Sequence, residues 1–296
     1  MYRYLSAIGM SEYISKKRLD SFVHACLLST DMDTDIYTDT VTGETTVELT
    51  RPMDTFGFVL RGVQEGAAVS LTSVMPIIRT FRNYMQLTNW DVESLEEVRP
   101  VLCGDDVQFG TPIEVILTQR HPMVKRFLDA PPILTVGLCA LSTSGQILLN
   151  VVRNAEDEQA YRDEEDWRRE MANRVRQGDR DAERSLTEDS RMIEEDMRER
   201  LKTEDVYTIL ESLIIPADDS TFGLYNILGT ITAIHKIMNP LTEEWVYEFE
   251  LNVMGTPYNL YINPRDLEGQ PSVGMRFQGS AMLMGDVMWN SEIQIS

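Results

Sequence analysis

The sequence has little cysteine, few basic residues and no long apolar run. Its three cysteines, Cys26, Cys103 and Cys139, lie far apart and are odd in number, which excludes a disulfide framework. The longest apolar run, near residues 133–141, is too short to cross a bilayer as a helix. The opening residues also lack the apolar core of a signal peptide. We therefore expect a cytoplasmic protein without a membrane partner.

Basic residues are scarce along the whole chain. The 296 residues include 27 Lys and Arg against 48 Asp and Glu, which gives a net charge of −21. The segment 206–296 has only three basic residues: Lys236, Arg265 and Arg276. A nucleic-acid-binding protein needs a positive patch to displace counterions from phosphates. We therefore expect no nucleic-acid partner, and the same sign of charge disfavours an anionic membrane surface.

The motifs of common catalytic and cofactor sites are also absent. There is no G-x-S-x-G, no Walker loop and no G-x-G-x-x-G. The run Asp31–Asp35 resembles the start of a calcium loop, but Ile36 stands where that loop needs glycine and Thr42 where it needs glutamate. The histidines do not have the spacing of zinc ligands: His24, His121 and His235. The sequence thus predicts no catalytic, metal-binding or cofactor-binding residue and no cofactor.

What the sequence does contain is a dense mixture of acids and arginines from residue 156 to about 202. Trp167, Met171 and Val175 share one helix face, and several acids precede an arginine by four residues. Gly178 and the following Asp179 predict a break and a second helix. The apolar stripes are too narrow for core helices. We interpret 154–203 as a charged helical connector, either a solvated spacer or an arm that docks a partner protein or a second copy of the chain.

The region before the connector, 1–153, has one strongly amphipathic helix followed by strands. Ser15 is a plausible N-cap for a helix whose apolar residues follow the spacing i, i+3, i+4, i+7, i+8: Leu19, Phe22, Val23, Cys26 and Leu27. Hairpins are predicted at 35–41 with 45–50, and at 133–141 with 146–152 about Ser142–Gly145. This order predicts an α+β domain with a mainly antiparallel sheet.

The region after the connector, 204–296, begins with a short predicted helix and continues with strands. We expect strands at 224–237, 244–254, 256–262, 275–284 and 287–289, with Gly285 and Asp286 as the last turn. About five strands, with a short helix between the third and the fourth, predict a small OB-like β-barrel. The aromatic and methionine side chains of these strands are interpreted mainly as core.

Several segments resemble a known family: YRYLSAIGMSE (2–12), EDVYTILESLIIP (204–216), YNILGTITAI (225–234), NPLTEEWVYEFEL (239–251) and VGMRFQGSAMLMG (273–285). They are similar to an uncharacterised family of clostridial Gram-positive bacteria, catalogued as a domain of unknown function. The resemblance covers nearly the whole chain and is weakest in the connector. It implies a bacterial cytoplasmic protein, with no assigned activity and no functional residue.

Three functions fit these features. The first is a non-enzymatic adaptor or regulatory protein that binds another protein through the connector. The second is a hydrolase that uses carboxylates in a cleft between the domains; surface acids are so common that no pair can be chosen from the sequence. The third is an OB-like module that binds a small molecule or a glycan.

Overall fold

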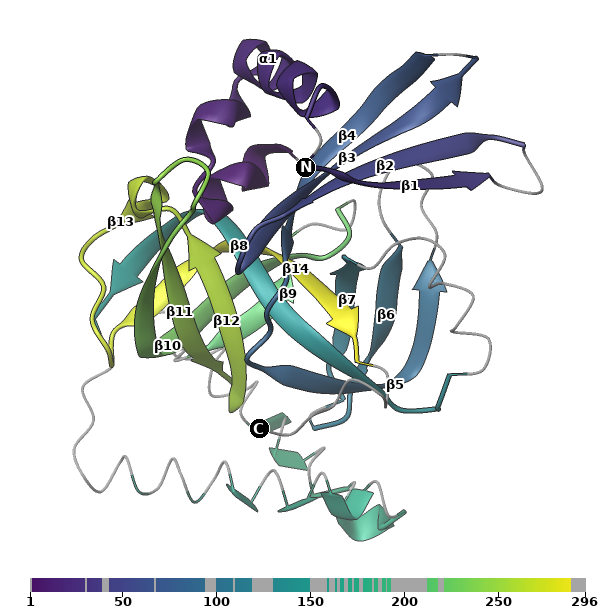
Figure 1. The fold of residues 1–296 in the computed structure, drawn as a ribbon. Helices are drawn as coiled ribbons and strands as arrows, with labels where there is room; N and C mark the ends of the chain where they lie inside the picture. The colour runs from purple at the N-terminus through teal and green to yellow at the C-terminus, as the bar shows by residue number, and fades with distance from the viewer. Residues whose placement is uncertain are drawn as a thin grey trace.

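The described part of the chain folds into a mostly β structure with two sheets and few helices (Figure 1). The computed structural model describes residues 2–29, 31–38, 43–66, 68–93, 100–108, 110–118, 130–149, 212–217 and 221–288, together with scattered residues between 159 and 192. The helical elements are η1 (Tyr2–Ile8), η2 (Ser11–Ile14), α1 (Lys16–Leu27) and η4 (Pro264–Asp266). The predicted α+β class is therefore corrected to mostly β, since strands make up most of the described elements.

The strands form a four-stranded and a ten-stranded sheet. The first contains β1 (Asp33–Thr38), β2 (Thr45–Pro52), β3 (Phe56–Glu65) and β4 (Ala68–Ile78). The second contains β5 (Tyr84–Glu93), β6 (Val101–Asp106), β7 (Pro112–Leu117), β8 (Leu134–Leu148), β9 (Leu213–Pro216), β10 (Leu224–Met238), β11 (Trp245–Val253), β12 (Thr256–Ile262), β13 (Leu267–Glu268) and β14 (Arg276–Val287). Figure 1 shows α1 above the four-stranded sheet, which projects from the larger one.

The predicted first helix and the first hairpin are confirmed. Helix α1 begins after Ser15, whose backbone is extended but whose side chain makes no capping hydrogen bond. Four of the five apolar positions are buried, whereas Leu27 is 53% exposed. The prediction of a buried Leu27 is wrong because this residue lies in the last position of the helix, beyond the side chains that cover its face. Strands β1 and β2 pair antiparallel.

The pairings of the ten-stranded sheet close two cycles. Strands β8, β12, β11, β10 and β14 form one cycle, and β8, β5, β6, β7 and β14 form the other. The long strands β8 and β14 belong to both and run through the centre, between the green and the blue strands of Figure 1. Each strand of a closed cycle has two neighbours in that cycle, each of which pairs with at least part of its backbone.

The hairpin predicted about Ser142–Gly145 is wrong. This stretch lies inside β8, which continues from Leu134 to Leu148. Strand β14 pairs with β8 along its whole length, and the Ser142 hydroxyl donates to the backbone oxygens of Ser144 and Ser280. Small polar residues favour a turn locally, but the long antiparallel partner satisfies the backbone of an extended strand instead.

The turn predicted at Gly285 and Asp286 is wrong for the same reason. Strand β14 is continuous from Arg276 to Val287, and these two residues pair with Leu138 and Gly137 of β8. Glycine here allows close approach: a Cβ on Gly285 would lie 2.4 Å from the Gly137 backbone oxygen. Gly285 marks a point where β14 and β8 lie unusually close, since any larger residue would have to displace backbone atoms.

Segments from both sides of residues 154–203 contribute to the ten-stranded sheet. Strand β8 pairs with β12, β13 and β14, all of which follow the predicted connector in the sequence. The predicted boundaries at 153 and 204 therefore do not divide this sheet into separate parts.

Two apolar clusters fill the fold. One lies within the cycles and includes Leu138, Ala140 and Leu283; the other contains the N-terminal elements and includes Cys139 and Met284. Successive residues of a strand point to opposite faces. Strands β8 and β14 contribute to both clusters, which explains why residues 136–141 and 281–284 are apolar in succession instead of alternating.

The predicted connector lies largely outside the described residues. The described residues between 159 and 192 have helical backbone except Gly178 and Asp179, where a break is expected. The Asp179 carboxylate accepts hydrogen bonds from the backbone N–H groups of Asp181 and Ala182, as an N-cap does. The connector as a whole, and the helix expected at 204–213, stay predictions. Among the described residues, no helix has the length and apolar character needed to cross a membrane.

Candidate functional site

A pocket of about 240 Å³ lies where the four-stranded sheet meets the ten-stranded one. Its described lining comes from β1, β2 and β4 on one side and from the ends of β7 and β14 on the other. The lining residues are Asp33, Thr50, Pro52, Ile77, Ile78, Arg79, Thr118 and Asp286. Ligand sites are often found where two structural units meet. We call this the inter-sheet pocket.

One carboxylate of the pocket is held by the ten-stranded sheet. Thr118 follows β7, and its backbone N–H donates to the Gly285 oxygen at 2.9 Å. The Thr118 hydroxyl donates to Oδ1 of Asp286 on β14. The parallel pairing of β7 with β14 brings these two residues together although they are far apart in the sequence. The position of the Asp286 carboxylate is therefore set by the strand pairing.

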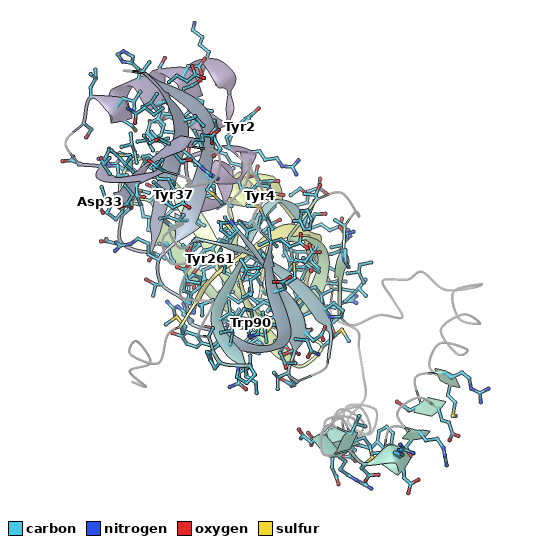
Figure 2. The ribbon with its side chains drawn as sticks, turned by 90° about the vertical axis from the view of Figure 1, so that its right-hand side faces the viewer. Tyr2, Tyr4, Asp33, Tyr37, Trp90 and Tyr261 are labelled. Atoms are coloured by element: carbon cyan, nitrogen blue, oxygen red, sulfur yellow. The ribbon has the colours of Figure 1, made fainter. Side chains whose placement is uncertain are left out.

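The other carboxylate comes from the four-stranded sheet. Asp33 begins β1, visible in Figure 2, and lies opposite Thr50 of β2 in the antiparallel register. Residues that oppose each other on neighbouring strands share one face of the sheet. Thr50 is 7% exposed, and its Oγ1 has no hydrogen-bond partner among the described residues. A buried hydroxyl without a partner is costly, so the rest of this wall has to hold Thr50 in place.

The pocket also has a cation and an apolar wall. Arg79 follows β4; its backbone N–H donates to the Thr55 oxygen and its Nη1 to the Met53 oxygen, each at 2.9 Å. These bonds fix the arginine at the rim, and its guanidinium has five N–H donors in all. Pro52 and two isoleucines give the wall its apolar surface. The pocket thus combines carboxylates, a guanidinium, hydroxyls and an apolar wall.

A second polar cluster is buried where β11 and β12 face the N-terminal elements. Glu248 is 1% exposed, and its Oε1 accepts hydrogen bonds from the Asn259 amide at 3.0 Å and the Tyr261 hydroxyl at 2.8 Å. Arg82, between β4 and β5, forms an ion pair with the same oxygen at 3.2 Å. The Asn83 amide donates to Asn259. Burial, with the Glu248 charge, raises the pKa of Tyr261 well above its usual range, so this hydroxyl is a donor and not a base.

This cluster has the character of a structural network. Its members come from three separate segments, and Tyr261, labelled in Figure 2, is 1% exposed. The second carboxylate oxygen, Oε2 of Glu248, is buried without a hydrogen-bond partner among the described residues. Glu248 is not among the described lining residues of the inter-sheet pocket. We therefore assign the cluster to holding the link between the two sheets in place.

The histidines and the acidic run singled out in the sequence lie outside both the inter-sheet pocket and the cluster around Glu248, or outside the described residues, except for Asp33. His24 is exposed on α1, and His235 lies 3.7 Å from Glu250 on the next strand; His121 lies outside the described residues. Of the acidic run 31–35, Asp33 lines the inter-sheet pocket, although the run begins a strand and not a metal loop.

The three thiols are not activated nucleophiles. Burial raises the pKa of Cys26 and of Cys103 to about 11, and that of Cys139 well above its usual value. A cysteine nucleophile needs a lowered pKa, because only the thiolate reacts. The expected role of Cys26 and Cys139 as small buried side chains is confirmed by exposures of 3% and 1%.

Sequence reasoning missed the pocket because its residues come from five separate segments. Asp286 was interpreted as a turn residue, while Thr118 and Arg79 carry no signal of their own. The family model described as a domain of unknown function, E. rectale Gene description (DUF3881), matches residues 5–285. No curated protein and no solved structure matches the chain. Since the match covers nearly all of the sequence, the chain belongs to this family, as the resemblance of its motifs indicated.

Proposed function

We propose that the protein binds a small molecule in the inter-sheet pocket, and that this molecule has a primary ammonium group on an apolar body. The observation that carries the proposal is the pair Asp33 and Asp286, placed in one pocket by two different sheets. An ammonium group between carboxylates forms charge-assisted hydrogen bonds, which are about twice as strong as neutral ones.

The other lining groups narrow the ligand further. The apolar wall favours a short hydrocarbon chain, and the guanidinium of Arg79 favours a carboxylate at the outer end. A volume of about 240 Å³ suits a molecule the size of one amino acid. The net charge of −21 disfavours a ligand that is only anionic. A zwitterionic amino acid with an apolar side chain therefore fits the pocket best.

Titration of the ¹⁵N-labelled full chain with leucine, n-butylammonium and butyrate tests this proposal. We expect saturable shifts of backbone signals near Asp33 and Asp286 with leucine, weaker shifts with n-butylammonium, and none with butyrate. Asp286→Asn should weaken leucine binding about tenfold or more, because the charge is lost at nearly the same volume. Asp20→Asn, on the exposed face of α1, is the matched control. Equal binding by all variants would place the ligand elsewhere.

The same two carboxylates are the observation that favours the hydrolase alternative. A carboxylate pair can act as general acid and base when it flanks a scissile bond. Incubation of the chain with peptide and glycoside substrates distinguishes the two functions: turnover that Asp33→Asn and Asp286→Asn both abolish would establish an enzyme. Saturable leucine binding without turnover supports the binding function.

The OB-like interpretation is supported by the cycle of β8, β12, β11, β10 and β14. Strands β10, β11 and β12 form an antiparallel meander, and η4 lies between β12 and β14. OB folds are five-stranded and partly open, and they bind ligands on an outer face. We infer that this cycle is an OB-like unit in which β8, from before residue 154, supplies the remaining strand.

A protein partner for residues 156–202 stays a separate prediction. Affinity capture of the tagged chain, beside a variant in which a short flexible linker replaces 156–202, measures it. A stoichiometric partner that is lost with the deletion would support the adaptor function. Retention of that partner would reject a role for this segment.

A further inference from the structure

A second hollow lies on the outer face of the ten-stranded sheet, away from the inter-sheet pocket. It has a volume of about 350 Å³ and is lined by β8, β10, η4, β13 and β14. Its described lining residues are Ser144, Gly145, Gln146, Asn226, Asp266, Glu268, Gln278, Gly279 and Ser280. None of them is aromatic or aliphatic, and none is basic. We call this the polar groove.

The strand register places the polar side chains in two rows across the groove. Asn226 of β10 lies opposite Ser280 of β14, which lies opposite Ser144 of β8. The second row contains Gln278 of β14, Gln146 of β8 and Glu268 of β13. Opposed residues share one face of a sheet, so each row presents its side chains on the same side.

Gly145 lies on β8 between Ser144 of the first row and Gln146 of the second, and its surroundings explain why these polar side chains face outward. A Cβ on Gly145 would lie 2.2 Å from Cε2 of Phe277. The Phe277 ring is fully buried on the inner side of the sheet at this point. The inner face is therefore filled by the core, and the alternating residues Ser144 and Gln146 project to the outer face.

The rows are held in place by hydrogen bonds between their own members. The Gln146 amide donates to the Gln278 oxygen, and the Ser280 hydroxyl donates to the Asn226 oxygen at 2.7 Å. A side-chain amide offers two donors and an acceptor, and a hydroxyl offers one donor and two acceptors. Such a lining is pre-organised and matches a ligand whose groups are both donors and acceptors, as alcohol groups are.

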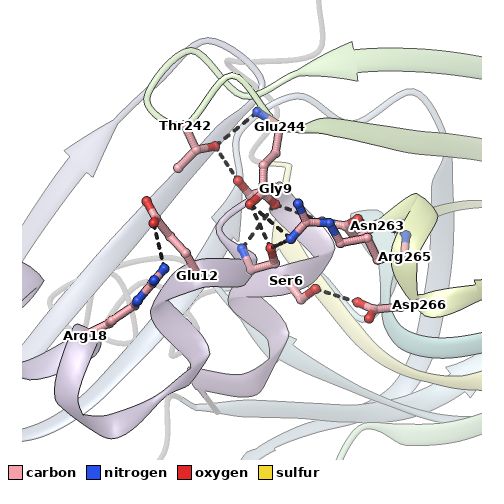
Figure 3. Close-up of polar contacts among 10 residues, drawn as sticks. Ser6, Gly9, Glu12, Arg18, Thr242, Glu244, Asn263, Arg265 and Asp266 are labelled. Carbon is pink, nitrogen blue, oxygen red and sulfur yellow. Dashed lines mark hydrogen bonds and ion pairs between the residues drawn. The ribbon is translucent and has the colours of Figure 1, made fainter.

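The acidic rim of the groove is fixed by the N-terminal segment (Figure 3). The Ser6 hydroxyl donates to Oδ2 of Asp266 at 2.5 Å. The η4 turn that carries Asp266 is tied further by Asn263, whose amide donates to Glu244, and by Arg265, whose Nη1 donates to the Ser11 hydroxyl at 2.9 Å. The carboxylates at the rim accept hydrogen bonds only, which again suits hydroxyl donors.

We propose that the polar groove binds an uncharged polyhydroxylated ligand, a sugar unit or a short oligosaccharide. Amides and hydroxyls outnumber the two carboxylates of the lining, and these carboxylates oppose phosphates or sulfates. The described lining has no aliphatic or aromatic side chain that would favour a hydrophobic ligand. This site is independent of the inter-sheet pocket, because the two share no lining residue.

Calorimetry and ¹⁵N chemical-shift titration of the full chain test the proposal with maltotriose, cellotriose and chitotriose. Glucose 6-phosphate and spermidine serve as the anionic and cationic comparison probes. We expect saturable binding of at least one neutral sugar, with shifts at Gln146, Gln278 and Ser280. The double variant Gln146→Leu, Gln278→Leu should weaken that binding at least tenfold, since each lost bond costs a few-fold in affinity.

Gln86→Leu, an exposed glutamine on β5 outside the groove, is the matched control and should bind like the unaltered chain. The thermal unfolding midpoint of each variant is compared with that of the unaltered chain. Equal midpoints show that a loss of binding is not caused by a folding defect. Two results would overturn the proposal: no saturable binding of any of these sugars, or binding of spermidine alone, which would make the groove a cation site. Leucine binding at the inter-sheet pocket is expected to survive in the glutamine double variant, so the failure of one site is separable from that of the other.

Discussion

At the scale of single residues, glycines inside strands decide how closely the strands approach. Gly145 and Gly285 stand in stretches whose composition is typical of turns, yet both lie in the longest pairing of the sheet. The missing side chain of Gly145 leaves room for the Phe277 ring, and that of Gly285 leaves room for the Gly137 backbone oxygen. This requirement belongs to the packed strands and cannot be seen in either segment alone.

Gly145→Ala is therefore expected to destabilise the fold by about 1–3 kcal/mol, the usual cost of overpacking a core. The new Cβ would lie 2.2 Å from the Phe277 ring, which is fully buried. Urea unfolding followed by tryptophan fluorescence measures the effect. Ser144→Ala, at the exposed neighbouring position, should change the free energy of unfolding by less than about 0.5 kcal/mol. Equal effects of the two substitutions would refute the packing argument.

The buried carboxylate of Glu248 leads to a second prediction. Its Oε2 already has no hydrogen-bond partner among the described residues, and Oε1 accepts from Tyr261. Tyr261→Phe removes one donor from a buried charge and should cost about 1–3 kcal/mol. Tyr84→Phe is the control, because the Tyr84 hydroxyl bonds a backbone oxygen at an exposed position. Chemical denaturation of both variants would show whether the Tyr261 hydroxyl matters more.

The raised thiol pKa of Cys26 predicts a loss of stability in alkali. Burial raises the pKa of Cys26 from 9.0 to about 11. Below pH 9 the folded and the unfolded chain both hold the proton. Between pH 9 and 11 only the unfolded chain releases it, so stability falls as the pH rises. Urea midpoints at pH 8 and pH 10.5, in reducing buffer, should fall more for the unaltered chain than for Cys26→Ala. Identical falls would show that this thiol makes no contribution.

At the scale of elements, the N-terminal segment, residues 2–14, packs between the two sheets. Tyr4 to Met10 are buried, and a polar network holds them to the turn between β10 and β11 (Figure 3). Asn239 is fully buried; its amide donates to the Ile8 oxygen at 2.6 Å, and its oxygen accepts from the Leu241 N–H. Gly9 has a positive φ of 76° and lies against Asn239, so the N-terminal segment needs glycine at this bend.

Asn239→Ala should weaken the attachment of the N-terminal segment and reduce the free energy of unfolding by about 2–3 kcal/mol, because it leaves the buried Ile8 oxygen unpaired. Hydrogen exchange of residues 2–14 should accelerate more than that of β8. Asn252→Ala, exposed on β11, is the control and should leave both quantities unchanged. Unaltered exchange of residues 2–14 in Asn239→Ala would contradict the role of this contact.

At the scale of the whole molecule, the closure of the cycles joins segments that are far apart in the sequence. Strand β8 receives β12 on one side and β14 on the other, and neither is present in residues 1–153. Without these partners, β8 would lose the strands that pair with its edges and much of the apolar cluster that covers Leu138 and Ala140. The long-range pairings should also make folding slower than that of a helical protein of similar size.

Fragments 1–153 and 204–296, produced separately, are therefore expected not to fold, whereas the two mixed together should recover the native spectrum. Dispersion of ¹H–¹⁵N spectra measures this directly. A well-dispersed spectrum from either fragment alone would show that the shared sheet is not required for folding. The full chain cleaved within 156–202 is the control, since it contains both halves in their folded arrangement.

The sequence by itself determined the features that depend on near neighbours. Helix α1 follows from the spacing of Leu19, Phe22 and Cys26, and the β11–β12 hairpin from two strand patterns about Gly255. The membership of the family was also visible in local segments such as residues 2–12.

Only the tertiary structure decided that residues 142–145 and 285–286 are strand, that Glu248 is buried, and that Asp33 and Asp286 line one pocket. The physical reason is that a long partner strand satisfies backbone groups that a turn would otherwise satisfy locally. The two pocket carboxylates lie more than 250 positions apart in the sequence, so only the pairing of the strands between them brings them to one place.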